Sequence, residues 1–228
     1  IKSADGATGI TVADSTGAIA VSNNLNISGD LVPNTPLSHR NLIINGAFNI
    51  WQRSTDITAS DGSNEGYNSA DRWYFNFNSG CPGTLDIDRS TDAPDGFGYS
   101  MKLKCNATGT PVSSSSDFVT ASTRIEAQDL QHLNYGSSSA KVTTLSWYMK
   151  SVNYTDPITF SIQKPDGTAA YYLKSFTPTT SWARYTMTIP ANTNSGHTIA
   201  NDNGVGFKVQ ITLSGSYGGS DEQTGASS

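Results

Sequence analysis

The residues of this sequence that could carry out chemistry are few and widely separated. Its three histidines, His39, His132 and His197, stand in different segments and lack the short spacing typical of metal ligands. The sequence contains no nucleophile elbow, phosphate-binding loop, HExxH motif or CxxC pair. We therefore expect no catalytic residue, no metal site and no cofactor.

Two groups of aspartates are further candidates. Asp86 and Asp88 have the residue type used in glycoside hydrolysis, but acids that alternate along one face of a strand are usually just solvated. Asp92 and Asp95, in DRSTDAPDGFG, offer oxygens of the kind that bind calcium. Aspartates in such turns more often cap backbone N–H groups. We favour the structural interpretation for both groups.

Aromatic side chains on polar strand faces point to a different chemistry, the stacking of sugar rings. Strand alternation places Tyr74, Tyr148 and Tyr172 outward, and it places Trp182 on the same side as Arg184. These four aromatic residues are the candidate glycan contacts. The alternative is that the tyrosines pack along sheet edges with their hydroxyls in water, and that Trp182 covers the end of the core.

The elements that would position these residues are short strands with one apolar and one polar face. Such alternation recurs over residues 73–78, 85–88, 99–105, 144–150, 158–163, 184–189 and 205–213. Only AQDLQHLNY, at 127–135, resembles a helical turn. Half-buried strands with little helix between them predict an all-β fold, an antiparallel sandwich.

Composition agrees with this fold and excludes some partners. Hydrophobic residues make up 36% of the chain and charged residues 14%, so turn-forming polar residues are abundant. The net charge of −5 argues against nucleic acid and anionic membranes as partners. No apolar run approaches the roughly 20 residues that a membrane-spanning helix needs, so we expect no membrane insertion. Cys81 and Cys105 could be reduced or could form a disulfide.

Residues 1–40 differ from the rest of the chain. Short Ile/Val alternations are separated there by Gly, Asp and Asn, and each contains too few apolar residues to build a core within one chain. We interpret 1–40 as an intertwined β shaft or attachment segment, with a flexible linker as the alternative. Pro33 and Pro36 mark the boundary, and 41–228 forms the sandwich domain.

Several motifs of the sequence resemble those of a known group of proteins. RNLIINGAFNIWQRSTD followed by SADRWYFNF resembles the globular domains of tailed-bacteriophage virion proteins, especially tail fibres and similar appendages. Further matches are SSTRIEAQDLQHLNYG, LSWYMKS and TTSWARYTMTIP, so the resemblance covers roughly residues 40–213. Ser54 replaces a glycine often found after the Gln-Arg pair, and the apolar strand and Gln-Leu-Glu-x-Gly-like motif usual at the C-terminal end are absent.

The resemblance implies a carbohydrate-binding-module-like jelly roll that is preceded by a shaft and carries no catalytic residue. We expect a non-enzymatic virion protein, a homotrimeric tail fibre or surface appendage that contacts other virion proteins and host-surface polysaccharide. It would be assembled in the host bacterial cytoplasm and reside on the tail or capsid surface. The alternatives are a capsid decoration or head-fibre protein, and a carbohydrate-binding module of a secreted bacterial enzyme. The motif-rich stretch 41–73 is expected to build the core and to contact no ligand.

Overall fold

A computed structural model describes residues 11–12, 19–20, 41–60, 65–77, 85–105 and 118–215. The chain divides into two compact units, 1–40 and 41–228. In the first unit, β1 (Thr11–Val12) pairs antiparallel with β2 (Ile19–Ala20). The rest of the predicted shaft lies outside the described residues, as do His39, Cys81 and the side chain of Cys105. The described residues include no helix long and apolar enough to cross a membrane.

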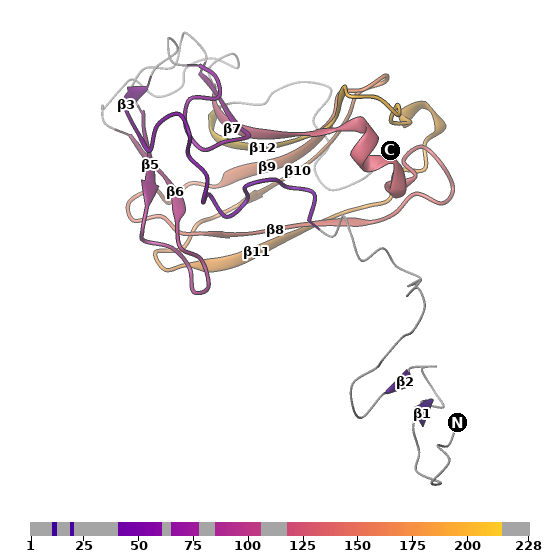
Figure 1. The fold of residues 1–228 in the computed structure, drawn as a ribbon, viewed down its shortest axis with the longest axis horizontal. Helices are drawn as coiled ribbons and strands as arrows, with labels where there is room; N and C mark the ends of the chain where they lie inside the picture. The colour runs from indigo at the N-terminus through magenta and orange to yellow at the C-terminus, as the bar shows by residue number, and fades with distance from the viewer. Residues whose placement is uncertain are drawn as a thin grey trace. The chain divides into compact units, whose positions relative to one another are not determined.

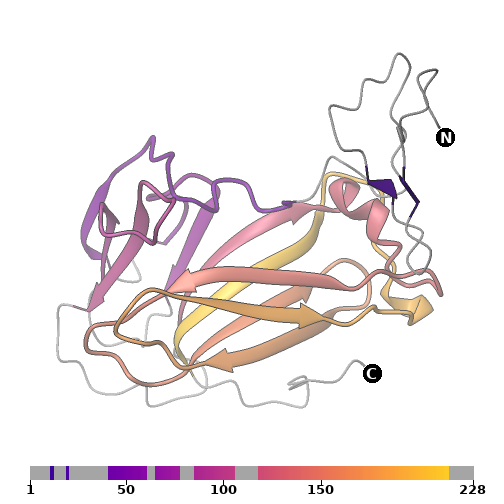
Figure 2. The ribbon, with the colours of Figure 1, turned by 90° about the horizontal axis from the view of Figure 1, so that it is seen from below.

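The second unit has two layers of strands (Figures 1 and 2). One layer is a five-stranded sheet, in the order β10 (Ala170–Phe176), β9 (Ile158–Lys164), β12 (Val205–Gly215), β7 (Phe118–Glu126) and β4 (Trp73–Phe77). The other layer has two parts. One pairs β11 (Ala183–Ile189) with β8 (Thr143–Met149), and the other joins β3 (Asp56–Ser60), β5 (Leu85–Ser90) and β6 (Ser100–Cys105).

The two parts of the second layer close over two adjoining clusters of buried side chains. The β8–β11 pair covers one cluster, which includes Leu145, Phe160, Met187 and Phe207. The three-stranded sheet covers the other, in which Phe75 and Ile87 are each 1% exposed. The buried residues of this second cluster are Trp51, Ala70, Trp73, Phe75, Phe77, Leu85, Ile87, Val119 and Ala121. All pairings between the named strands are antiparallel. Residues 41–215 are therefore an antiparallel β-sandwich of jelly-roll type, and the predicted fold class is confirmed.

Strand alternation predicted the inward residues correctly in most of the sandwich. In β4 the exposure alternates residue by residue, with Trp73, Phe75 and Phe77 buried. The predicted helical turn forms η2 (Ala127–Leu133), a 3-10 helix whose Leu130 and Leu133 are buried; a second short one, η3 (Ser195–His197), precedes β12. Each confirmed element has a clear apolar face, which fixes the register of a half-buried strand.

Strand β10 is the exception, and there the prediction was wrong. Tyr172 pairs with Ile162 of β9 and packs against the first core cluster, so it does not point outward. Tyr171, its neighbour in sequence, is the exposed residue, with 41% of its surface accessible. The stretch AYYLKSF has large side chains at both odd and even positions, so its alternation did not determine which face is buried.

Candidate functional site

The other three predicted contacts are divided between the two layers of the sandwich, with Tyr74 on one layer and Tyr148 and Trp182 on the other. Tyr74 is on the outer face of the five-stranded sheet, opposite Ser122. Tyr148 is on β8 opposite Arg184, in the other layer; it is 41% exposed, and its ring lies 5.6 Å from that of Phe97. The structure does not bring the four predicted residues together into one site.

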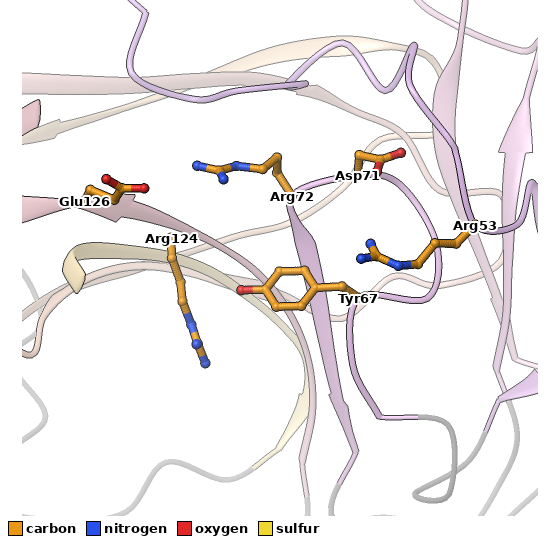
Figure 3. Close-up of a pocket in the computed structure, with 6 residues that line it drawn as sticks. All are labelled: Arg53, Tyr67, Asp71, Arg72, Arg124 and Glu126. Carbon is orange, nitrogen blue, oxygen red and sulfur yellow. The ribbon is translucent and has the colours of Figure 1, made fainter. Parts of the chain in front are cut away.

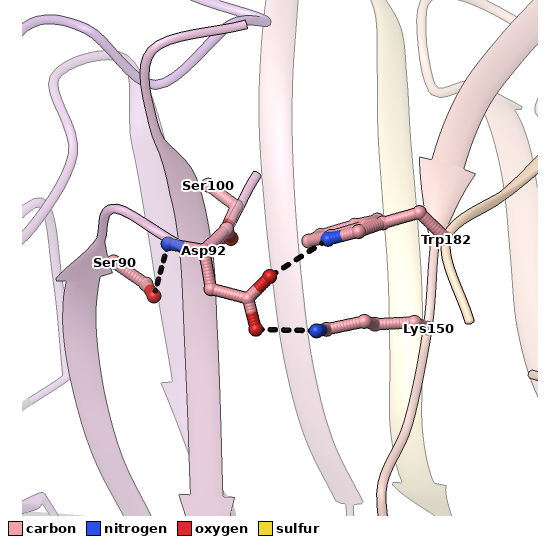
Figure 4. A network of polar contacts seen from close by, with 5 residues as sticks. All are labelled: Ser90, Asp92, Ser100, Lys150 and Trp182. Atoms are coloured by element: carbon pink, nitrogen blue, oxygen red, sulfur yellow. Dashed lines mark hydrogen bonds and ion pairs between the residues drawn. The ribbon is translucent and has the colours of Figure 1, made fainter. Parts of the chain in front are cut away.

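Trp182 takes part in a polar network that joins the two parts of the second layer (Figure 4). Its indole Nε1 donates to Asp92 Oδ1 at 2.9 Å, and Lys150 donates to Asp92 Oδ2. The Lys150 ammonium also lies 5.3 Å from the centre of the Trp182 ring. The hydrogen bonds from Lys150 and then Trp182 lower the pKa of Asp92. The indole N–H of Trp182 is thus used within the protein, where it helps to join the two parts of the second layer.

Asp86 and Asp88 also interact with neighbouring groups, whereas Asp95 is exposed in the turn that follows. Asp86 forms an ion pair with Lys104, its cross-strand partner, at 3.7 Å. Asp88 lies opposite Lys102 on one side and Asp56 on the other, and burial followed by the charge of Asp56 raises its pKa. No group of three or more potential metal-ligating side chains occurs within the part of the chain that the structure describes.

A pocket of about 420 Å³ opens at the β4 edge of the five-stranded sheet (Figure 3). Its lining comes from the loop before β3, the loop before β4 and the end of β7. Figure 3 shows the Tyr67 ring lying between the Arg53 and Arg124 side chains. We call this site the arginine pocket; it is lined by Arg53, Tyr67, Asp71, Arg72, Arg124 and Glu126.

Tyr74 supports the wall of the arginine pocket. Its ring meets that of Tyr67 edge to face, with centroids 5.1 Å apart, and the Arg124 guanidinium lies 5.2 Å from its centre. The Tyr74 hydroxyl donates to Glu65 Oε1 at 2.5 Å, and this bond is the main cause of the raised pKa of Tyr74. Tyr74 is therefore held on three sides, and Tyr67 is the ring that faces the pocket.

The loops that carry the pocket residues are fixed by a set of hydrogen bonds around Asn45, which we call the Asn45 clamp. Asn45 Nδ2 donates to the carbonyls of Ile50 and Asp71, both at 2.9 Å, and its Oδ1 accepts from Ile50 N–H at 3.0 Å. Asp71 Oδ2 accepts from Gln52 N–H at 2.7 Å, and Trp73 Nε1 donates to the Asn45 carbonyl at 3.3 Å. The clamp joins the NGAFNIWQR segment to the ADRW segment. It therefore holds the loop that carries Arg53 next to the loop that carries Arg72.

The middle of the sheet's outer face offers little access. Ser122, Gln210 and Ser161 lie side by side there on β7, β12 and β9, and they are 1%, 3% and 5% exposed. Arg124, by contrast, is exposed at the edge of the same face. The accessible guanidinium group of Arg124 thus lies beside the arginine pocket, away from the inaccessible middle of the face.

Sequence reasoning missed the residues that form this pocket. Arg53, Asp71 and Arg72 belong to the stretch 41–73, which we expected to build the core and to contact no ligand. In the structure these three residues line a pocket. Arg124 lies within the SSTRIEAQDLQHLNYG match and Tyr67 stands just before SADRWYFNF, but neither residue had been assigned a binding role. The available signal was the pair of arginines in WQR and ADR, each of which lies within one of the two motif segments.

Comparison with known proteins found structures of low similarity. No protein family and no curated protein sequence matches the chain. One similar structure is the enzymatically active domain of tailspike protein 4 of bacteriophage CBA120, with a TM-score of 0.42 and 13% identity over 78% of this chain and 20% of that one. Another is described as "CBM4 structure and function", with a TM-score of 0.39 and 19% identity over 76% of this chain and 89% of that one. This chain thus spans about a fifth of the tailspike structure.

Proposed function

We propose that residues 41–228 form a non-enzymatic glycan-binding domain of a tailed-phage virion appendage, such as a tail fibre. The arginine pocket is the observation that carries the glycan-binding part of the proposal. It combines an aromatic wall at Tyr67 with guanidinium donors from three segments of the chain. Sugar rings present C–H faces to aromatic side chains and hydroxyls to polar ones, and sites of this kind pair an aromatic surface with a few fixed polar groups.

The virion assignment rests on the sequence motifs of residues 40–213. In this proposal residues 1–40 join three copies of the chain and attach them to other virion proteins. Three sandwich domains on one shaft would act together on a repeating polysaccharide, so that weak individual contacts give useful binding. A purified full chain that sediments as a monomer would rule out the trimer. Labelled antibody on purified particles would assign the protein to tail or head.

Glycan binding is tested with the full chain and purified host-surface polysaccharide. We expect Tyr67→Ala to reduce binding at least tenfold, because stacking on this ring would be lost. Tyr148→Ala is the matched comparison, since this exposed tyrosine lies on the other layer of the sandwich. Equal binding by wild type and Tyr67→Ala would contradict the assignment of the site, and loss of binding in Tyr148→Ala alone would move the site to that layer.

A further inference from the structure

The three arginines of the pocket come from different segments, and in the part of the chain that the structure describes none of them lies at ion-pair distance from a carboxylate. Within the described residues the two ion pairs are Lys104–Asp86 and Lys150–Asp92. Arg53, Arg72 and Arg124 take part in neither, and the contact recorded for this group is that of Arg124 with the Tyr74 ring. Three exposed arginines thus line a pocket of about 420 Å³.

The two carboxylates of the pocket are engaged elsewhere. Asp71 Oδ2 accepts from Gln52 N–H at 2.7 Å, and Glu126 Oε2 accepts from Gln128 Nε2 at 2.8 Å. The first bond ties the Asp71 carboxylate to the loop that carries Arg53, and the second ties the Glu126 carboxylate to η2. The Asp71 and Glu126 carboxylates therefore reduce the net positive charge of the pocket. They leave the guanidinium donors of the pocket available to a ligand.

Positive charge extends from the pocket along the sheet. Lys208 of β12 lies directly opposite Arg124 of β7, on the same outer face. Like charges in directly opposite positions destabilise a sheet. Burial, and then the charge of Arg124, lowers the pKa of Lys208. The folded chain therefore holds two cations together at a cost that a bound anion would offset.

The backbone of Arg72 shows a second local cost. Its φ of 71° lies in the left-handed region, which non-glycine residues other than Asn and Asp seldom adopt. In the ADRW segment this conformation directs the Arg72 side chain towards the pocket while the following Trp73 enters the core (Figure 3). The turn therefore serves the core and the pocket at once.

From these contacts we infer that the arginine pocket binds the acidic group, a carboxylate or a phosphate, of an anionic saccharide unit. The inference rests on the proposed glycan-binding function and specifies its ligand class. Guanidinium groups bind both anions through paired N–H donors, and Tyr67 supplies the wall against which the sugar ring packs. A volume of about 420 Å³ is within the usual range of small-ligand pockets. Because the whole chain has a net charge of −5, the attraction is local.

The test compares three probes on the full chain by calorimetry: galacturonate oligosaccharides, mannose 6-phosphate oligosaccharides and neutral dextran oligosaccharides. We expect at least one anionic probe to bind tenfold or more tightly than dextran at low salt, with the advantage falling as salt increases. Arg72→Gln and Arg124→Gln should each reduce the ratio of anionic to neutral affinity at least tenfold. Arg184→Gln, an exposed arginine on β11, is the matched control and should change nothing.

The outcomes separate this inference from the function on which it rests. Preference for galacturonate identifies a carboxylate ligand, and preference for the phosphorylated probe identifies a phosphate ligand. If dextran binds as tightly as both anionic probes and Tyr67→Ala abolishes that binding, the anion inference is overturned and glycan binding stands. If no probe and no host polysaccharide binds, the glycan-binding function fails and the inference fails with it. Thermal melting of each variant checks that it is folded.

Discussion

Replacing Asn45 with alanine should destabilise the sandwich domain by about 4 kcal/mol, although the side chain is only partly buried. Alanine removes the bonds to the Ile50 and Asp71 carbonyls and from the Ile50 N–H. At about 1 kcal/mol each, their loss costs about 3 kcal/mol. Asn45 also has a φ of 55°, and alanine tolerates this left-handed conformation less well, which adds about 1 kcal/mol.

Two further variants divide this effect into its parts. Asn45→Gly removes the same hydrogen bonds but accepts the positive φ, so it should retain most of the destabilisation, about 3 kcal/mol. Asn49→Ala is the matched control: it lies in the same loop, is exposed and has no hydrogen bond within the described residues. It should change stability by less than about 0.5 kcal/mol.

Urea unfolding followed by fluorescence measures these differences. Amide hydrogen exchange adds a local readout, because the Asp71 N–H donates to the Ile50 carbonyl at 3.1 Å and should lose protection in Asn45→Ala. A loss of stability below about 1 kcal/mol in Asn45→Ala would refute the clamp. Wild-type stability in Asn45→Gly would show that backbone conformation, and not the hydrogen bonds, explains the loss.

Two remaining predictions concern pH. Burial raises the pKa of Tyr135 from 10.0 to about 12, so its contribution to stability is fully present below pH 10.0 and is lost as pH rises towards 12. By linkage, the loss of unfolding free energy is about 3 kcal/mol. Tyr135→Phe should remove most of the fall in unfolding free energy between pH 10 and pH 12. An unchanged fall in this variant would contradict the raised pKa of Tyr135. The pKa of Asp92 lies below its ordinary 3.8, so its contribution is present above pH 3.8 and is lost as pH falls through the lower folded value. The Trp182 indole NMR signal should titrate below pH 3.8 in wild type and not in Asp92→Asn, and a midpoint above 3.8 would refute the network.

Much of the sandwich could be predicted because alternation encodes which side of a strand is buried. Trp73, Phe75 and Phe77 in β4, and Phe160 and Ile162 in β9, face the core as the pattern requires. Each of these strands has large apolar residues on one side and polar residues on the other. The hydrophobic pattern then leaves a single acceptable register.

Strand β7 was missed for the opposite reason. It occupies an interior position between β12 and β4, yet its core-facing residues include Ala121 and Thr123, and its outward Thr120 and Ser122 are buried as well. Small and polar residues on both faces give no alternation of hydrophobicity. Residues 118–126 form a strand because they pair with β12 and β4. This pairing depends on the whole folded chain and not on a local sequence pattern.

The candidate site escaped prediction because alternation describes faces of strands, whereas the pocket is built from loops. Arg53 and Arg72 are 19 positions apart in the sequence, and the Asn45 clamp brings their loops together. The motif residues Asn45, Asp71 and Trp73 are structural, as the sequence suggested. The arginines that follow or lie between them are not needed for the clamp or the core, since none of the clamp's bonds uses a guanidinium group. A stretch that organises a fold can therefore also present a site, because residues that hold a loop rigid also fix the side chains beside them. In this chain the same rigidity gives the arginine pocket a defined geometry before any ligand binds.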